Sequence, residues 1–199
     1  MGQHKSVQSL RRELIRAVVT SPGSSRYNIA KGLPYPNSTV YYELSRLEQE
    51  GHIRVENGLV YPTLKGLVEY VDFIGCDAAV VRAAVKVLGA DVREGVCEFL
   101  ESLRPYKERL DDNPLTALLL FLGFPVNLDM VKKLSSGISS IVAKLVADRL
   151  PAVTFAGHRG ILFIDEDGST WFVGYCERCG GYVADRCPLL EPYYHRSDK

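Results

Sequence analysis

The segment from Gly23 to Lys65 constrains the fold of this chain more than any other, because helix signals, chain breakers and a turn signal follow one another closely. Residues 24–31 have the pattern of a short capped helix, from which Tyr27, Ile29 and Ala30 are expected to pack inward. The glycine and prolines that follow cannot continue a helix, so a turn is predicted before the next element.

A longer helix is predicted over residues 37–50. Asn37 and Ser38 are expected to cap it through their side-chain oxygens, and Gly51 is expected to end it. Apolar residues recur at helical spacing and form one stripe, which comprises Val40, Leu44 and Leu47. The opposite side is predicted to be a continuous polar face, made of Ser38, Thr39, Tyr42, Glu43 and Arg46.

A hairpin is predicted directly after this helix. Residues 53–56 and 59–61 read as two short strands, and Asn57 and Gly58 between them suit a tight turn because both can adopt positive φ. An earlier helix is also predicted, since apolar residues recur at helical spacing up to Val18 and would pack on the other two helices.

The residue spacing across the second helix and the hairpin follows a known pattern. It is carried by Val40, Tyr41, Leu44, Arg46, Leu47, Glu48, Gly51 and Ile53, followed by Tyr61, Thr63, Lys65 and Gly66. In this spacing, roughly the first third of the chain resembles the PadR/MarR class of winged helix-turn-helix transcriptional regulators. Pro62 departs from the pattern and favours an exposed edge for the second hairpin strand.

The resemblance implies that the helix at residues 37–50 enters the major groove of double-stranded DNA, and that the protein is a homodimer. Four side chains are then expected near base edges, namely Ser38, Thr39, Tyr42 and Arg46. Three are expected to hold phosphates, namely Arg26, Arg54 and Lys65. Ser25 and Asn37, at the starts of the two helices, complete the candidate DNA-binding set.

The charge distribution agrees with this expectation only modestly. The 199 residues carry 24 basic and 24 acidic side chains, but residues 1–70 hold nine Lys or Arg against six acids. The positive surplus thus lies where DNA is expected, and a dimer would double it. It is smaller than binding by phosphate neutralisation alone would usually require.

The sequence favours a cytoplasmic protein without enzymatic activity. No secretory signal opens the chain, and its most apolar run, residues 115–124, is about half as long as a membrane span. It lacks the nucleotide-binding P-loop, the serine-hydrolase motif and the zinc-protease motif.

Past Leu67 the apolar pattern becomes helical, with helices predicted at about 67–74, 77–88, 91–109, 113–123 and 128–150. The last of these contains several serines and a glycine, which would let a second helix approach closely. We expect it either to mediate the dimer or to close the core of its own subunit. Cys76 and Cys97 are expected to be small hydrophobes on helical faces, and a disulfide between them is the alternative.

Past Pro151 the period of the apolar residues changes to two, which predicts strands at 153–155, 161–164 and 171–175 and a turn at Asp167 and Gly168. A C-x2-C pair follows the last strand. Together with two later residues it suggests a structural zinc site, made of Cys176, Cys179, Cys187 and His195. His158 is a rival fourth ligand, and buried cysteines or a redox pair are the alternatives to zinc.

These observations predict a mostly α protein with small β. It would have a winged-helix DNA-binding domain at 1–70, a helical linker and dimerisation region at 71–150, and a small β unit with the cysteine pair at 151–199. The expected function is that of a sequence-specific double-stranded DNA-binding transcriptional regulator. The alternative is a protein-interaction module of a general transcription or chromosome-maintenance complex, partnered by other transcription proteins.

Overall fold

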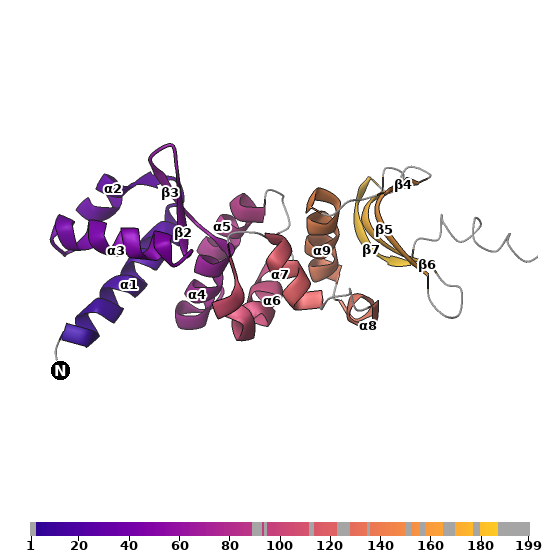
Figure 1. Ribbon diagram of the computed structural model, residues 1–199, viewed down its shortest axis with the longest axis horizontal. Coiled ribbons are helices and arrows are strands. Elements are labelled where there is room, and N and C mark those ends of the chain that lie inside the picture. The colour runs from indigo at the N-terminus through magenta and orange to yellow at the C-terminus, as the bar shows by residue number, and fades with distance from the viewer. Residues whose placement is uncertain are drawn as a thin grey trace, which may run out of the picture. The chain divides into compact units, whose positions relative to one another are not determined.

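The computed structural model describes residues 3–88, 93, 95–111, 114–122, 128–134, 136–149, 153–155, 158–164, 170–176 and 180–186. It confirms a mostly α protein with small antiparallel sheets (Figure 1). The chain forms two compact units, one comprising Met1–Asp91 with Cys97–Pro114 and the other Val92–Val96 with Leu115–Lys199. The three-part division at residues 70 and 150 stays a prediction.

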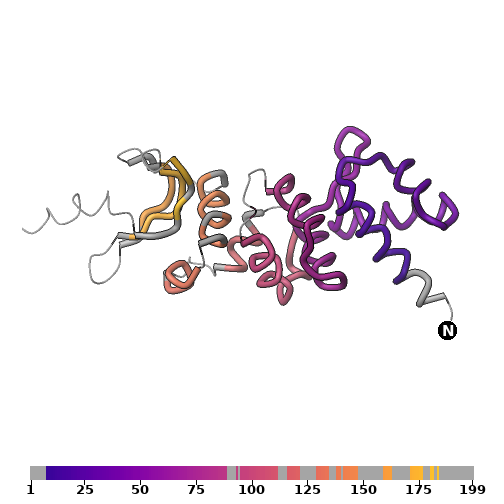
Figure 2. Tube along the Cα trace, turned by 180° about the vertical axis from the view of Figure 1, so that it is seen from behind, coloured from indigo at the N-terminus to yellow at the C-terminus, as the bar shows by residue number. Residues whose placement is uncertain are grey.

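The N-terminal elements are helices with three short strands among them. In chain order they are α1 (Gln3–Thr20), β1 (Ser24–Ser25), α2 (Arg26–Lys31), α3 (Asn37–Gln49), β2 (Ile53–Glu56), β3 (Leu59–Pro62), α4 (Leu64–Ile74), α5 (Ala78–Leu88), α6 (Val96–Leu103) and the 3-10 helix η1 (Arg104–Arg109). Helix α1 contacts α2, α3, α4 and α5, and Figure 2 shows the same trace from behind.

The core of this unit is built around α1. Leu14, Ile15 and Val18 are buried along one side of α1, as the apolar period predicts. The predicted stripe of α3 is confirmed, since Val40, Leu44 and Leu47 are all fully buried. The packing of these two stripes fixes which side of α3 faces away from the protein.

Two local predictions about these helices are wrong. Tyr27 is 58% exposed, because a helix of six residues buries only one side and Ile29 and Ala30 occupy it. No side chain caps α3, which begins directly after Pro36. The Pro36 carbonyl accepts the backbone N–H of Val40 at 3.1 Å, as the residue before a helix ordinarily does.

The three N-terminal strands form an antiparallel sheet in the order β1-β3-β2. The predicted turn is confirmed, with φ of 51° at Asn57 and 78° at Gly58. The expectation that β3 is an edge strand is wrong, because β1 pairs with its outer side at Val60 and Leu59. Pro62 is tolerated because it ends β3, beyond the residues that pair with β1.

Helix α4 starts one turn earlier than the apolar period predicts. Thr63 caps it, since its Oγ1 accepts the N–H of Gly66 at 3.1 Å and donates to the carbonyl of Gly51 at 2.6 Å. Gly66 lies against the His52 carbonyl, where an added Cβ would stand 2.1 Å from the oxygen. The glycine therefore lets α4 approach the start of the hairpin.

Two predicted long helices are each broken in the structure. The helix expected over 91–109 becomes α6 and the 3-10 helix η1, since Pro105 has no N–H to continue the α-helical pattern. The helix expected over 128–150 becomes α8 (Leu128–Lys132) and α9 (Ser136–Arg149).

The second unit packs a helix on a sheet. Its elements are α7 (Pro114–Leu122), α8, α9, β4 (Val153–Phe155), β5 (His158–Ile164), β6 (Thr170–Cys176) and β7 (Gly181–Arg186). The strands pair in sequence order, all antiparallel, and α9 contacts β5, β6 and β7. Strand β7 was not predicted, and the predicted turn at Asp167 and Gly168 lies outside the described residues.

Helix α9 buries its apolar side chains within its own unit. Ile138, Ile141, Val142, Leu145 and Val146 are all buried. This packing is the one expected of a helix that closes the core of its subunit. In the described part of the chain, no helix has the length and apolar character needed to cross a membrane.

Cys76 and Cys97 form a disulfide, so the expectation that they act as small hydrophobes is wrong. Their Cα atoms lie 5.6 Å apart, one just after α4 and the other near the start of α6. The helical period placed each cysteine on an apolar face but carried no distance between the two faces.

Candidate nucleic-acid interface

The side of α3 opposite its buried stripe faces away from the protein. Ser38 and Thr39 are exposed, and Tyr42, one turn later, is 66% exposed. Asn37, at the first position of the helix, is exposed as well. These four side chains therefore project from one half of α3 where another molecule can reach them.

Glu43 does not belong to this exposed face, contrary to the prediction. It is only 3% exposed, and both of its carboxylate oxygens accept from Nη1 of Arg46, at 3.1 and 3.3 Å. Nη2 of Arg46 donates to Glu50 at 3.3 Å. Arg46 is thus held between two carboxylates, of which one is buried.

The carboxylate of Glu50 connects α3 to α1. Arg11 lies 2.5 Å from it, and the same guanidinium is within 3.3 Å of Nδ1 of His52. Sequence reasoning missed Arg11 and His52, because they lie far apart in the chain and no motif joins them. They continue the charged network of α3 toward the sheet.

His52 is the one group of this network whose protonation is strongly disfavoured. Burial, followed by the charges of Arg11 and Lys65, lowers the pKa of His52 to about 4. Glu69 and Glu50 oppose this shift without cancelling it. His52 is therefore neutral at physiological pH.

The two predicted phosphate-binding arginines are paired with glutamates at the surface. Arg26 forms an ion pair with Glu48, and Arg54 pairs with Glu56 at 3.0 Å while its guanidinium lies over the Tyr61 ring. All four charged side chains are partly exposed. Such pairs are worth only about 0 to 1 kcal/mol, so they can exchange partners readily.

The other two candidates have different local settings. Ser25 caps α2, since its Oγ accepts the N–H of Asn28 at 3.2 Å, and it therefore has a structural role in the isolated chain. Lys65 lies half-buried in the first turn of α4. The structure brings the predicted set onto β1, α2, α3, the hairpin and the start of α4, all in one unit.

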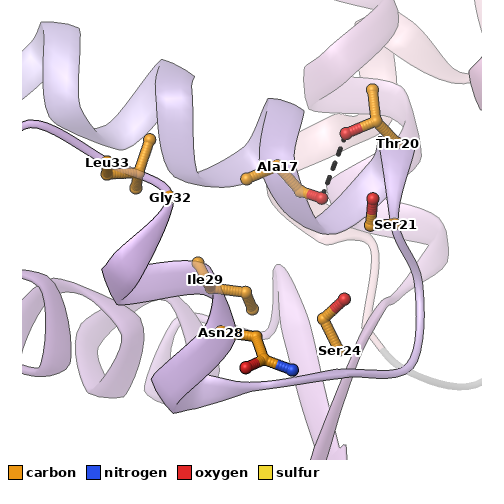
Figure 3. A pocket seen from close by; sticks show the side chains of 8 residues that line it. All are labelled: Ala17, Thr20, Ser21, Ser24, Asn28, Ile29, Gly32 and Leu33. Carbon is orange, nitrogen blue, oxygen red and sulfur yellow. Dashed lines mark hydrogen bonds between the residues drawn. The ribbon is translucent and has the colours of Figure 1, made fainter.

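A cavity of about 200 Å³ lies between the end of α1, β1 and α2 (Figure 3). Its lining comprises Ala17, Thr20, Ser21, Ser24, Asn28, Ile29, Gly32 and Leu33, with no charged group. Thr20 donates to the Ala17 carbonyl at 3.2 Å and so uses its hydroxyl within α1. The volume is below the range of about 300 to 1,000 Å³ of small-molecule sites, so we assign it no ligand.

Only one of the four predicted zinc ligands lies within the described residues. Cys176 ends β6, where it is fully buried beside Phe172, Leu162 and Val183. Cys179, Cys187 and His195 lie outside the described residues. His158, the rival fourth ligand, lies at the start of β5 and not in the loop expected for it, and strand pairing sets its backbone opposite Cys176. The described residues contain no group of three or more metal-ligating side chains.

A scan of the sequence against protein-family models finds no match, and searches of curated proteins and of solved structures find no similar protein either.

Proposed function

We propose that this protein is a winged helix-turn-helix regulator that binds double-stranded DNA through the exposed face of α3. The observation that carries the proposal is the exposure of Ser38, Thr39 and Tyr42 on the side opposite a fully buried apolar stripe. Helices α2 and α3 form the two-helix element, and the hairpin of β2 and β3 is the wing. A groove-reading helix needs this polar, unobstructed side.

Two arginines near α3 can leave their glutamate partners at low cost. Arg26 and Arg54 can exchange partly exposed glutamates for DNA phosphates at a cost of about 0 to 1 kcal/mol each. Charge-assisted contacts to phosphate recover this cost. We therefore assign these two arginines and Lys65 to the DNA backbone, where they would set the orientation of α3.

The expected function is tested by fluorescence anisotropy of the full chain on random duplex DNA at two salt concentrations. We expect measurable affinity that falls as salt increases, because each phosphate contact releases counterions. Replacing Arg54 by Gln should reduce the slope of log affinity against log salt by about one. Absence of duplex binding at low salt would overturn the proposal.

One observation favours the alternative of a protein-interaction module. Arg26, Arg46 and Arg54 all face glutamates, which weakens the positive potential of the surface. A module that docks on other transcription proteins would show no salt-sensitive affinity for duplex DNA. The same titration therefore separates the two functions.

A homodimer is part of the proposal, because regulators of this kind read two half-sites about one helical turn apart. Sedimentation of the full chain with and without duplex DNA measures its stoichiometry. A single copy bound to every duplex would count against the dimer.

Zinc remains a proposal for the C-terminal residues. The thiolates of Cys176, Cys179 and Cys187 would bind the ion together with a fourth ligand, His195 or His158. The ion would have a structural role and no catalytic one. Elemental analysis of the purified protein should give one zinc per chain, and a Cys179→Ser variant should give none. Zinc-free wild-type protein would instead support buried cysteines.

A further inference from the structure

The exposed side chains of α3 are all uncharged. They are Asn37, Ser38, Thr39, Tyr42 and Gln49, whereas its charged residues are buried or only partly exposed. Gln49 is twelve residues from Asn37, or about 18 Å along the helix, too far to share one short set of base pairs with it. The N-terminal half of α3 therefore presents amide, hydroxyl and methyl groups and no available cation.

Arg46 cannot leave its partners cheaply. Its release would leave the Glu43 carboxylate buried without a counter-charge, which is destabilising even though Arg46 itself is 41% exposed. A contact from Arg46 to guanine would have to offset this loss. The ion pair therefore disfavours guanine reading, and Arg46 acts as a positioning residue for α3.

We infer that α3 reads A·T base pairs, an inference that rests on the proposed DNA-binding function. The amide of Asn37 matches the N6 and N7 pattern of adenine, and the methyl group of Thr39 matches the C5 methyl of thymine. The hydroxyls of Ser38 and Tyr42 can serve as donor or acceptor. Arginine is the residue that most often reads guanine, and the guanidinium of Arg46 is hydrogen-bonded to Glu43 and Glu50.

The charge of the surrounding surface fits the DNA backbone on either side of such a site. Residues 1–70 carry nine Lys or Arg against six Asp or Glu, and two of these arginines exchange partners at low cost. The backbone contacts are independent of sequence, so base preference falls to the uncharged half of α3.

The test is selection of bound duplexes from a random pool by the full chain, followed by anisotropy on single duplexes. The enriched core should consist of A·T pairs. Replacing its thymines by deoxyuracil should weaken binding about fourfold for each methyl group contacted. Exchanging a contacted A·T pair for G·C should weaken it about tenfold or more.

Two variants check the role of Arg46. Glu43→Gln removes the buried charge and releases Arg46, so it should raise affinity for duplexes that carry guanine in the core. Arg46→Ala leaves Glu43 unpaired and can fail to fold, so the Glu43→Gln/Arg46→Ala double variant is measured beside it. This double variant should keep the A·T preference of the wild type.

The outcomes of these experiments distinguish a failure of A·T reading from a failure of the proposed DNA-binding function. A core with fixed guanines, lost in the double variant, would overturn A·T reading while leaving DNA binding intact. Binding without base preference would do the same. Failure to retain any duplex would overturn the proposed function itself.

Discussion

At the scale of single residues, Arg46 differs from Arg26 and Arg54 because one carboxylate of its ion pairs is buried. The sequence correctly predicts that Ser38, Thr39 and Tyr42 are exposed, because the helical period assigns each position to a side. It places Glu43 on the same side, since it is close to the boundary of the stripe. Only the packing of the surrounding elements decides that this carboxylate is covered.

Loss of the Arg46 guanidinium should destabilise the protein through Glu43. We expect Arg46→Ala to lower the free energy of unfolding by about 2 kcal/mol, less than for a fully buried pair because Arg46 is 41% exposed. In a Glu43→Gln background the same substitution should cost under about 1 kcal/mol. Urea denaturation of the four proteins measures the coupling, and additive effects would contradict it.

His52 should make stability depend on acid pH. Its pKa of about 4 in the folded protein is below the ordinary value of about 6.5, so the unfolded chain binds the proton more tightly. The stabilisation is complete above pH 6.5 and is lost as the pH falls through 4, by about 3 kcal/mol at pH 4. Denaturation from pH 7 to pH 4 should show this loss in the wild type and a smaller one in His52→Asn. Identical pH dependence of the two proteins would refute the assignment.

At the scale of elements, most of the short N-terminal elements were predictable because each has its own local signal, whereas β1 lies at the start of the segment predicted as a helix. The turn at Asn57 and Gly58, the buried stripe of α3 and the end of α2 all lie within a few residues of their cause. The two long helices were not predicted correctly, because the apolar period continues across the positions where the structure breaks them. Partners distant in sequence, such as the two disulfide cysteines, leave no local signal.

Gly66 should not tolerate a side chain, because α4 lies directly on the His52 carbonyl. We expect Gly66→Ala to destabilise the protein by about 1 to 3 kcal/mol or more, since the added Cβ would meet backbone that cannot rotate away. Ala78 is exposed at the start of α5, and Ala78→Gly is the matched control because it measures the difference in helix propensity between alanine and glycine alone. A Gly66→Ala protein as stable as the wild type in thermal melts would show that α4 can shift.

The disulfide should stabilise the first unit by lowering the conformational entropy of the unfolded chain. Its cysteines are 21 residues apart, a spacing for which the entropic model gives about 3 kcal/mol. Reduction of the wild type should lower its unfolding free energy by this amount. The Cys76→Ser/Cys97→Ser variant should already be less stable and should not respond to the reductant; an equal response would assign the effect to other cysteines.

At the scale of the whole molecule, the chain combines two compact units with different architectures, and every candidate DNA contact lies in the first. The composition of the chain predicts neither fact, because its net charge of zero averages a basic N-terminal part with an acidic remainder. The second unit closes its own sheet with α9 and shares none of the candidate DNA-binding residues.

DNA reading by α3 can be measured by comparing the affinities of three full-length proteins for a selected duplex. The Thr39→Ala/Tyr42→Ala variant alters only the exposed face of α3, and Tyr106→Ala removes an exposed tyrosine of η1 as a control. We predict that the α3 variant binds at least about tenfold more weakly than the wild type, while the control is unchanged. Equal affinity of all three proteins would contradict DNA reading by α3.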